Sequence, residues 1–330
     1  MRRLADILGR TETALITAIL VTVVILSLSS PYFLTVSNLV NMVEAYSVTT
    51  ILAAGVFVVL VSGGIDISFT ATASATQYLG AYLATQLGFS AASALPLAAA
   101  LGVALGSINA LLTHYLRVAS IIVTIATSSI YYALLIYFTD AQEIYNLPDW
   151  WSSRVTFLRF SSASGVVRIT LPIVVMLVAV ALTQYLMRWT RIGRQIYALG
   201  GNPEAASRIG VGVLRVQLLA YGYLGLLAAV AGFVQASRVH QAVPTAMAGQ
   251  ELNVLAVAIL GGASLVGGVG SMGGVVFAVV FLAMLQNGLN LVGVSPYFFG
   301  VVTGLAILVS ISMTGFAEKH AHKRYAAGSP

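Results

Sequence analysis

The sequence predicts an all-α integral membrane protein of about ten transmembrane helices, forming a single domain over residues 1–330. Of the 330 residues, 59% are hydrophobic and only 8% are charged, whereas about 25% are charged in an ordinary soluble domain. Such a chain cannot cover a water-facing surface with polar groups, so lipid must surround most of it. Apolar runs of membrane-crossing length also recur along the whole chain.

These apolar runs give the expected spans. A helix needs about 20 residues to cross roughly 30 Å of hydrocarbon. We expect spans near 14–30, 38–62, 69–87, 92–113, 119–139, 170–188, 214–236, 252–268, 273–291 and 297–315. Glycine interrupts the stretch between 252 and 291 repeatedly, so the helix ends there are the least sharply encoded.

The basic residues indicate which way the chain is threaded. Twelve of the sixteen Lys and Arg residues fall on the side of the termini, and four fall on the other side. The twelve are Arg2, Arg3, Arg10, Arg117, Arg188, Arg191, Arg194, Arg208, Arg215, Lys319, Lys323 and Arg324, and the four are Arg154, Arg159, Arg168 and Arg238. Positive charge is retained in the cytoplasm during insertion, so both termini and the tail 316–330 are expected to be cytoplasmic.

The longest loop on the outer side covers about 140–169 and contains Trp150 and Trp151. A tryptophan pair at this position is typical of an interfacial anchor. Contact with a partner protein outside the membrane is the alternative.

Several kinds of chemistry find no support in the sequence. There is no cysteine and no lysine before Lys319, so a thiolate site and a GxxxxGK[ST] phosphate loop are both excluded. The histidines form no paired metal-ligand set; they are His114, His240, His320 and His322. We therefore expect no catalytic residue, no metal site and no enzyme. The scattered basic residues fit membrane topology better than nucleic-acid binding.

A short capped helix is predicted in the cytoplasmic segment 198–212, ALGGNPEAASRIGVG. Asn202 suits the N-cap, and Pro203 suits the first helical position. Glu204 lies in the first turn, where the helix dipole favours negative charge, and Gly210 can adopt the positive φ that ends a helix. A helix of about 203–209 is marginal alone in water. The residues leave two functions open, a docking element or a plain connector.

Asp66 follows a glycine pair, Gly63–Gly64, at the end of an apolar run. An ionised side chain at mid-membrane costs roughly 2.5–3.5 kcal/mol on insertion, so it should face protein, a cavity or the headgroups. Asp66 either caps the next helix by accepting from N–H groups beyond Ser68, or contacts solute.

The segment 259–274, ILGGASLVGGVGSMGG, is too rich in glycine to form a stable straight helix. Backbone freed from a helix inside a membrane must be buried in protein or line a wet cavity. Gly261, Gly262 and Ser264 are therefore candidates either for close helix packing through small residues or for lining a pathway.

A polar stripe is expected on the second span, because Asn41, Glu44 and Ser47 share one face by i, i+3 spacing. Such a stripe avoids lipid either by hydrogen bonding to neighbouring helices or by lining a solute pathway. The sequence leaves both alternatives open.

Three of these segments resemble motifs of ABC importer permeases. Glu204-Ala205-Ala206 followed by Gly210 resembles the EAA-x-x-x-G coupling motif, and the preceding YALGGN resembles the branch that serves ribose and related monosaccharides. GGIDIS resembles GGIDLS of the same branch, and LGGASLVGGVGS resembles its LGG-x-S-L-x-GG-x-GS signature. The second match ends after Ser68, where Phe-Thr-Ala replaces Val-Gly-Ser.

The resemblance implies a vitamin-B12-importer-like permease fold in a bacterial inner membrane, moving a monosaccharide, polyol or related signalling solute. It implies two cytoplasmic ATPase subunits, which bind ATP and Mg²⁺, a second permease copy, identical or paralogous, and a periplasmic solute-binding protein. No cofactor is expected on this chain. The residues implied in coupling are Gly201, Asn202, Pro203, Glu204, Ala205, Ala206 and Gly210. Those implied in the pathway or its gating are Asn41, Glu44, Gly63, Gly64, Asp66, Ser68, Gly261, Gly262 and Ser264.

A function of another class stays open beside this one. Buried carboxylates also suit a proton-coupled secondary transporter, in which Asp66 and Glu44 would carry protons. Such a transporter has no need of a capped cytoplasmic helix bearing Glu-Ala-Ala and glycine.

Overall fold

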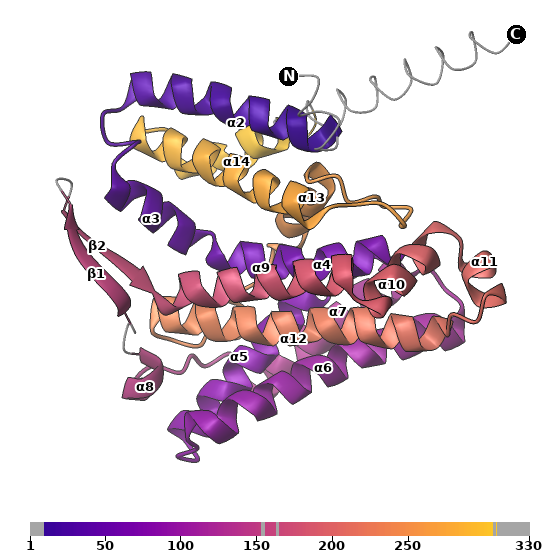
Figure 1. The fold of residues 1–330 in the computed structure, drawn as a ribbon. Coiled ribbons are helices and arrows are strands. Elements are labelled where there is room, and N and C mark those ends of the chain that lie inside the picture. The colour runs from indigo at the N-terminus through magenta and orange to yellow at the C-terminus, as the bar shows by residue number, and fades with distance from the viewer. Residues whose placement is uncertain (1–9, 153–155, 163–164, 306–307, 309–330) are drawn as a thin grey trace, which may run out of the picture.

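The computed structural model describes residues 10–152, 156–162, 165–305 and 308, and these form mainly helices (Figure 1). The helices are α2 (Arg10–Ser29), α3 (Val36–Ala45), α4 (Ser47–Val61), α5 (Phe69–Thr85), α6 (Ala91–Leu116), α7 (Ser120–Thr139), α8 (Asp149–Ser152), α9 (Leu171–Trp189), α10 (Arg191–Gly201), α11 (Pro203–Arg208), α12 (Val213–Val239), α13 (Glu251–Leu260) and α14 (Met272–Leu291). The remaining regular structure of the described residues is a 3-10 turn at Pro296–Phe298, a helical segment at 299–305, and two strands, β1 (Thr156–Ser162) and β2 (Gly165–Thr170).

Among the described residues, six single helices are long and apolar enough to cross a membrane. They are α2, α6, α7, α9, α12 and α14. Helices α3 and α4 together make a seventh candidate, bent by 47° where Tyr46 separates them. The protein is therefore a multi-pass helical membrane protein. Of the expected last span, 297–315, residues 297–305 and 308 are described, whereas the tail 316–330 lies outside the described residues.

The predicted full-length span at 252–268 is wrong. Helix α13 has only 10 residues, so it rises about 15 Å, half of the hydrocarbon thickness. The chain from 261 to 271 is irregular, and several of its glycines have positive φ values that a helix does not contain. Glycine ends this helix early because it adopts such conformations without steric cost.

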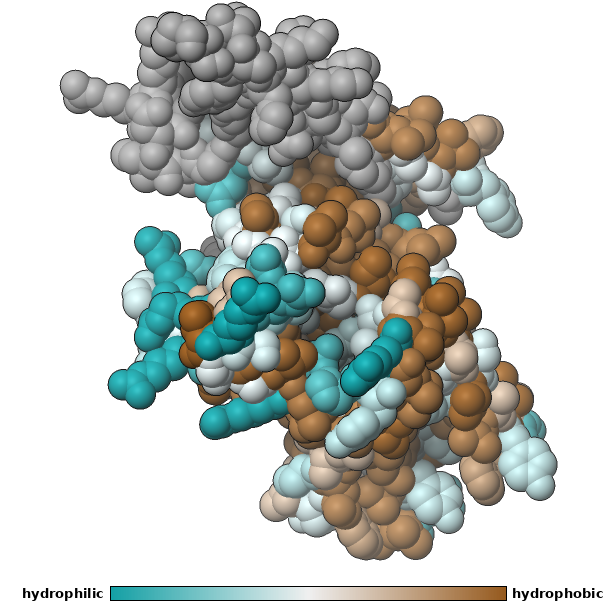
Figure 2. All heavy atoms as spheres, turned by 90° about the vertical axis from the view of Figure 1, so that its right-hand side faces the viewer, coloured by the Kyte–Doolittle hydropathy of each residue, from teal (hydrophilic) through white to brown (hydrophobic). Residues whose placement is uncertain are grey.

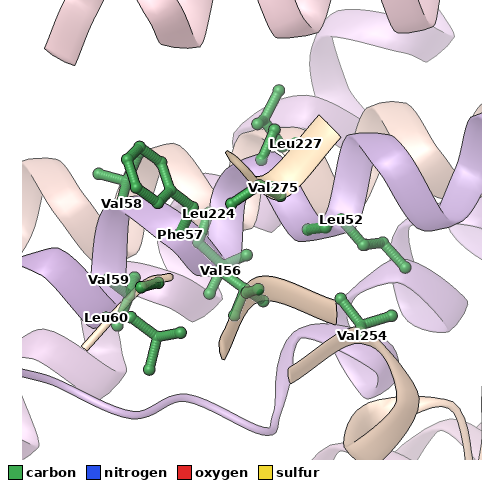
Figure 3. Close-up of a cluster of buried hydrophobic side chains, with 14 of the residues drawn as sticks. Leu52, Val56, Phe57, Val58, Val59, Leu60, Leu224, Leu227, Val254 and Val275 are labelled. Atoms are coloured by element: carbon green, nitrogen blue, oxygen red, sulfur yellow. The ribbon is translucent and has the colours of Figure 1, made fainter. Parts of the chain in front are cut away.

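Helix α4 lies at the centre of the fold. All of its residues except Thr49 are buried, which fits a helix that is apolar all round. Figure 3 shows its side chains packed against Leu224 and Leu227 of α12, Val254 of α13 and Val275 of α14. Movement of any of these helices therefore acts on α4.

The outer loop 140–169 differs from the all-α prediction. Strands β1 and β2 pair antiparallel as a hairpin beside the helical bundle (Figure 1). Trp151 is only 2% exposed, and its indole N–H donates to the carbonyl oxygen of Phe233 at 3.2 Å. The prediction of an interfacial anchor is therefore wrong for Trp151, because the ring is buried between α5, α6 and α12. Trp150 stacks on it, with ring centroids 5.5 Å apart.

The capped helix predicted as isolated between two spans has a helical neighbour. Helix α10 precedes it and begins at Arg191, and the hydroxyl of its N-cap, Thr190, accepts from the N–H of Gly193 at 3.0 Å. One face of α10 buries Ile196 and Leu199, and the opposite face exposes Arg191 and Arg194. Figure 2 looks onto the end of the molecule that carries α10 and α11 and shows hydrophilic side chains gathered there.

Candidate functional site

Helix α11 forms where the sequence predicts it. The side-chain oxygen of Asn202 accepts from the N–H of Ala205 at 3.0 Å, as an N-cap does. The helix ends at Arg208, and Gly210 follows with φ +87°. Glu204 lies in the first turn. The predicted cap, first turn and stop are thus confirmed.

Of the two alanines of α11, Ala206 is buried and Ala205 is exposed. Ala206 is 2% exposed and belongs to the hydrophobic core of this chain, so it is not available to a partner. Glu204 and Ala205 are exposed, and Ile209 beside them is 77% exposed. The outer face of α11 therefore combines a carboxylate, a small residue and an apolar side chain.

Three glycine pairs from distant parts of the sequence meet beside α10 and α11. The N–H of Gly268 donates to the carbonyl oxygen of Val61 at 2.9 Å. A Cβ placed on Gly267 would lie 2.6 Å from the Cα of Gly63 and 2.8 Å from the carbonyl oxygen of Gly200. We call Gly63, Gly200, Gly267 and Gly268 the glycine junction. It joins the ends of α4 and α10 to the loop after α13.

Gly200 is the most tightly enclosed member of the junction. A Cβ there would collide with the carbonyl oxygen of Val61 and would lie 2.5 Å from the nitrogen of Gly268. The neighbouring Gly201 has no atom within 4 Å of such a Cβ. The backbone of α10 therefore touches the backbone of two other segments with no side chain between them.

Tyr197 adds a side-chain link between α10 and the glycine-rich loop. Its hydroxyl donates to the carbonyl oxygen of Gly270 at 2.8 Å. Burial raises the pKa of Tyr197, so the phenol stays protonated and keeps this donor at neutral pH.

Helices α4 and α13 end in the same way. Gly63 and Gly262 follow the two helices with φ values of +87° and +91°. In each case the glycine N–H bonds three residues back and the next N–H bonds five residues back. This is the C-terminal glycine motif that satisfies the last helical carbonyls. Both breaks predicted from the sequence are therefore ordered.

Asp66 lies in a buried polar network between α4 and α5. It is 3% exposed, and one oxygen accepts from the N–H and hydroxyl of Ser68 at 2.7 and 2.8 Å. Its other oxygen accepts from the amide of Asn109 on α6 at 3.3 Å, and that amide also donates to the Ser68 hydroxyl at 2.6 Å. Tyr131 of α7 completes the network by donating to the Asn109 oxygen at 3.4 Å. Sequence reasoning missed Asn109, although an amide within an apolar span is a usable signal.

The capping interpretation of Asp66 needs correction. Its carboxylate binds the N–H of Ser68, the residue before α5, and not the amides beyond Ser68. Asp66 therefore orders the turn that enters α5.

Asp66 is also remote from Glu44, since the 15 residues of α4 between them span about 22 Å. The two carboxylates do not form one site.

The polar stripe expected on the second span is interrupted. The bend at Tyr46 separates Asn41 and Glu44 on α3 from Ser47 on α4. The hydroxyl of Ser47 donates to the backbone oxygen of Glu44 at 2.7 Å, within its own span. Asn41 is exposed and Glu44 is half-buried.

The residues predicted in the glycine-rich loop have local packing functions. A Cβ on Gly261 would lie 2.5 Å from the Cα of Val275 on α14, which shows close helix packing. The N–H of Ser264 donates to the carbonyl oxygen of Val269 at 3.0 Å and closes a turn. The hydroxyl of Ser271, the N-cap of α14, donates to the carboxylate of Glu12 on α2, a link that sequence reasoning missed. In the part of the chain that the structure describes, no His, Asp or Glu cluster could hold a metal.

The membrane helices, their ordered breaks and the attached short helices α10 and α11 define a multi-pass permease. The chain belongs to the family described as branched-chain amino acid transport system / permease component, whose model matches residues 38–311. It is 33% identical to the ribose import permease protein RbsC of Escherichia coli K12 over 297 residues, 89% of this chain and 90% of that protein. It is 34% identical to RbsC of Bacillus subtilis 168 over 289 residues, 88% of each chain.

A galactose relative matches over a still longer stretch. The galactose/methyl galactoside import permease protein MglC of E. coli K12 is 31% identical over 324 residues, 95% of this chain and 96% of that protein. These matches confirm the resemblance to ABC sugar permeases that the motifs indicate. No solved structure matches the chain.

Proposed function

We propose that this chain is the membrane-spanning permease subunit of an ATP-driven importer for a monosaccharide or a similar polyhydroxy solute. Relatives of nearly full-length overlap import ribose or galactose, according to their names. The observation that carries the mechanism is the glycine junction, because it fastens the cytoplasmic helices to α4 and to the loop after α13.

Coupling begins at the exposed face of α11 in this proposal. Glu204, Ala205 and Ile209 stand free of the rest of the chain, which suits a helix received by a separate ATPase. Gly201, Asn202, Pro203 and Gly210 set where α11 begins and ends, and Ala206 holds it to the core. In this proposal, a displacement of α11 moves α10 and, through α10, the glycine junction. Gly63 and the end of α4 then move with the loop after α13, because no flexible side chains lie between them.

The proposed topology has ten spans in a vitamin-B12-importer-like arrangement, with both termini in the cytoplasm of a bacterial cell. Helix α5, with 17 residues, adds to the seven candidates, and α13 adds a span with the irregular chain before it. The expected span at 297–315 is the tenth. Retention of positive charge in the cytoplasm supports the orientation.

The proposed assembly contains two ATPase subunits, a second permease copy and a periplasmic solute-binding protein. ATP and Mg²⁺ bind the ATPases, and this chain carries no cofactor, which agrees with the lack of a phosphate-loop sequence. Solute passes between the permease copies. Asn41, Glu44 and the buried Asp66–Ser68 turn are proposed to act in the pathway or its gating, with Gly64, Gly262 and Ser264 shaping the membrane breaks.

Uptake by proteoliposomes that contain the whole assembly tests this function. ATP inside the vesicles and loaded binding protein outside should drive accumulation of labelled ribose or another monosaccharide, and vanadate should stop it. A protonophore should leave uptake unchanged. Uptake that survives ATP depletion and collapses with the proton gradient would instead identify the secondary transporter built on Asp66 and Glu44, which the relatives do not favour.

A further inference from the structure

The connection between α12 and α13 returns from the outer side into the membrane. Ala242 lies at the outer end, where it exchanges two backbone hydrogen bonds of 3.0 Å with Ile144 of the outer loop. Helix α13 begins only at Glu251 and ends at Leu260, and the loop after it reaches the glycine junction on the cytoplasmic side at Gly267. Because α13 rises about 15 Å, its first residue lies near the middle of a hydrocarbon core roughly 30 Å thick.

One face of α5 holds this returning segment by polar contacts. The amide of Gln77 donates to the backbone oxygen of Gln241 at 3.3 Å, and the hydroxyl of Ser74 accepts from the N–H of Met247 at 3.4 Å. The hydroxyl of Thr70 donates to the carboxylate of Glu251 at 2.7 Å. Positions 70, 74 and 77 share one helix face. The Glu251 carboxylate is thus held at a defined depth.

Glu251 is held but not enclosed. It is only half-buried, Gly249 before it is exposed, and Leu252 after it is 75% exposed. A carboxylate at this depth cannot face lipid without a cost of several kcal/mol, and irregular backbone at this depth must be buried in protein or line a wet cavity. In the site proposed below, the exposed side of residues 249–252 faces water inside the membrane.

Two side chains on the same surface have unused hydrogen-bonding capacity. Tyr132 of α7 lies beside the hydroxyls of Thr70 and Ser74, but its buried hydroxyl forms no hydrogen bond of good geometry. The side-chain oxygen of Gln77, a residue 1% exposed, also has none. Unpaired buried polar atoms are rare and costly, so either group gains from pairing with a hydroxyl that enters the site.

We propose that Glu251, Tyr132 and Thr70 form a contact site for hydroxyl groups of the solute, midway along the pathway. This site rests on the proposed import function and deepens it. One Glu251 oxygen is engaged by Thr70, and the carboxylate has further lone pairs to accept from a sugar hydroxyl. The Tyr132 hydroxyl is both donor and acceptor, as a sugar hydroxyl is, so the two can pair in either direction.

The position of Glu251 on α13 links this site to the transport cycle. Glu251 begins the helix, and the chain that follows its last residue, Leu260, reaches the glycine junction at Gly267. A displacement of the junction therefore moves the carboxylate relative to Tyr132 on α7. The site would be assembled in one state of the permease and opened in the other, which suits brief contact with a passing solute.

The first test measures whether water reaches the site. The chain contains no cysteine, so a thiol reagent can react only with a cysteine that is introduced. Gln250→Cys, next to Glu251, should react with a charged, membrane-impermeant thiol reagent in the reconstituted importer, in at least one of the nucleotide-free and ATP-bound states. Val178→Cys is the control, because it is 51% exposed near the middle of the apolar helix α9. An unreactive Gln250→Cys in both states would overturn the proposal.

The second test separates solute contact from assembly. Glu251→Gln should lower solute uptake at least about tenfold, because hydrogen bonds to a charged acceptor are stronger than those to a neutral one. ATP hydrolysis stimulated by the binding protein should stay near the wild-type rate, and Glu251→Asp should recover part of the uptake. Equal uptake by Glu251→Gln and wild type would reject the site. Absence of ATP-dependent uptake in wild type would instead reject the import function itself.

Discussion

The carbonyl oxygen of Val61, at the end of α4, accepts a hydrogen bond of 2.9 Å from the N–H of Gly268, in the loop after α13. This contact places the two membrane breaks against each other. Gly200, at the end of α10, lies against both partners with no side chain between. Three segments that are far apart in the sequence thus share one backbone contact. Most of the mechanism proposed for this permease depends on it.

A methyl group at Gly200 should disrupt this contact. Gly200→Ala would force backbone apart at Val61 and Gly268, and overpacking of this kind costs about 1–3 kcal/mol. We expect a lower melting temperature of the purified assembly and ATP hydrolysis that no longer responds to loaded binding protein. Gly201→Ala is the matched comparison for stability, because its methyl group meets no atom within 4 Å. Equal melting of the two variants would contradict the packing described here.

The stop after α11 should tolerate asparagine but not valine. Gly210 has φ +87° in open space, so a side chain there meets conformational strain and no steric contact. A β-branched residue is strained by about 1–2 kcal/mol in this region, whereas asparagine adopts it more readily. Gly210→Val should insert into membranes normally yet lose ATP-driven uptake. Gly210→Asn should keep most of it, and full uptake by the valine variant would argue against this helix end as part of coupling.

The buried turn at Asp66 should depend on hydrogen-bond geometry more than on charge. Asp66→Asn retains an oxygen that can accept from Ser68, so assembly and uptake should be largely kept. Asn109→Leu removes a donor to both Asp66 and Ser68 and leaves buried groups unpaired, at about 1–3 kcal/mol. Thermal unfolding of the two variants tests whether Asn109→Leu is less stable than Asp66→Asn. Complete loss of uptake by a well-assembled Asp66→Asn protein would point to a proton-carrying function.

The loop 140–169 should be anchored to the helices mainly by one tryptophan of its pair, Trp151 on α8. Trp151→Ala removes a ring that is 2% exposed and should destabilise the protein by about 3–5 kcal/mol. Trp150→Ala, which removes the half-buried neighbouring ring, should cost clearly less. The difference is read from thermal unfolding of the two variants in the same detergent. Equal losses would show that Trp151 does not fill the space between α5, α6 and α12.

Local signals in the sequence predicted the short capped helix α11 well. Asn202, Pro203 and Gly210 encode a beginning and an end through their own backbone preferences, so no tertiary contact is needed to read them. The amphipathic α10 was missed because Thr190, its N-cap, follows the membrane span by a single residue. Its helical pattern therefore merges with that of α9.

The sequence by itself determined that lipid surrounds most of this protein, roughly where most of its apolar helices lie, and at which glycines two of them break. These follow from composition, run length and backbone freedom, which are properties of neighbouring residues. Only the tertiary structure decided that the breaks meet at Gly200, that Trp151 is buried, and that Thr70 of α5 is hydrogen-bonded to Glu251 of α13. Such contacts depend on how helices pack over long sequence separations, and no single segment encodes its partner.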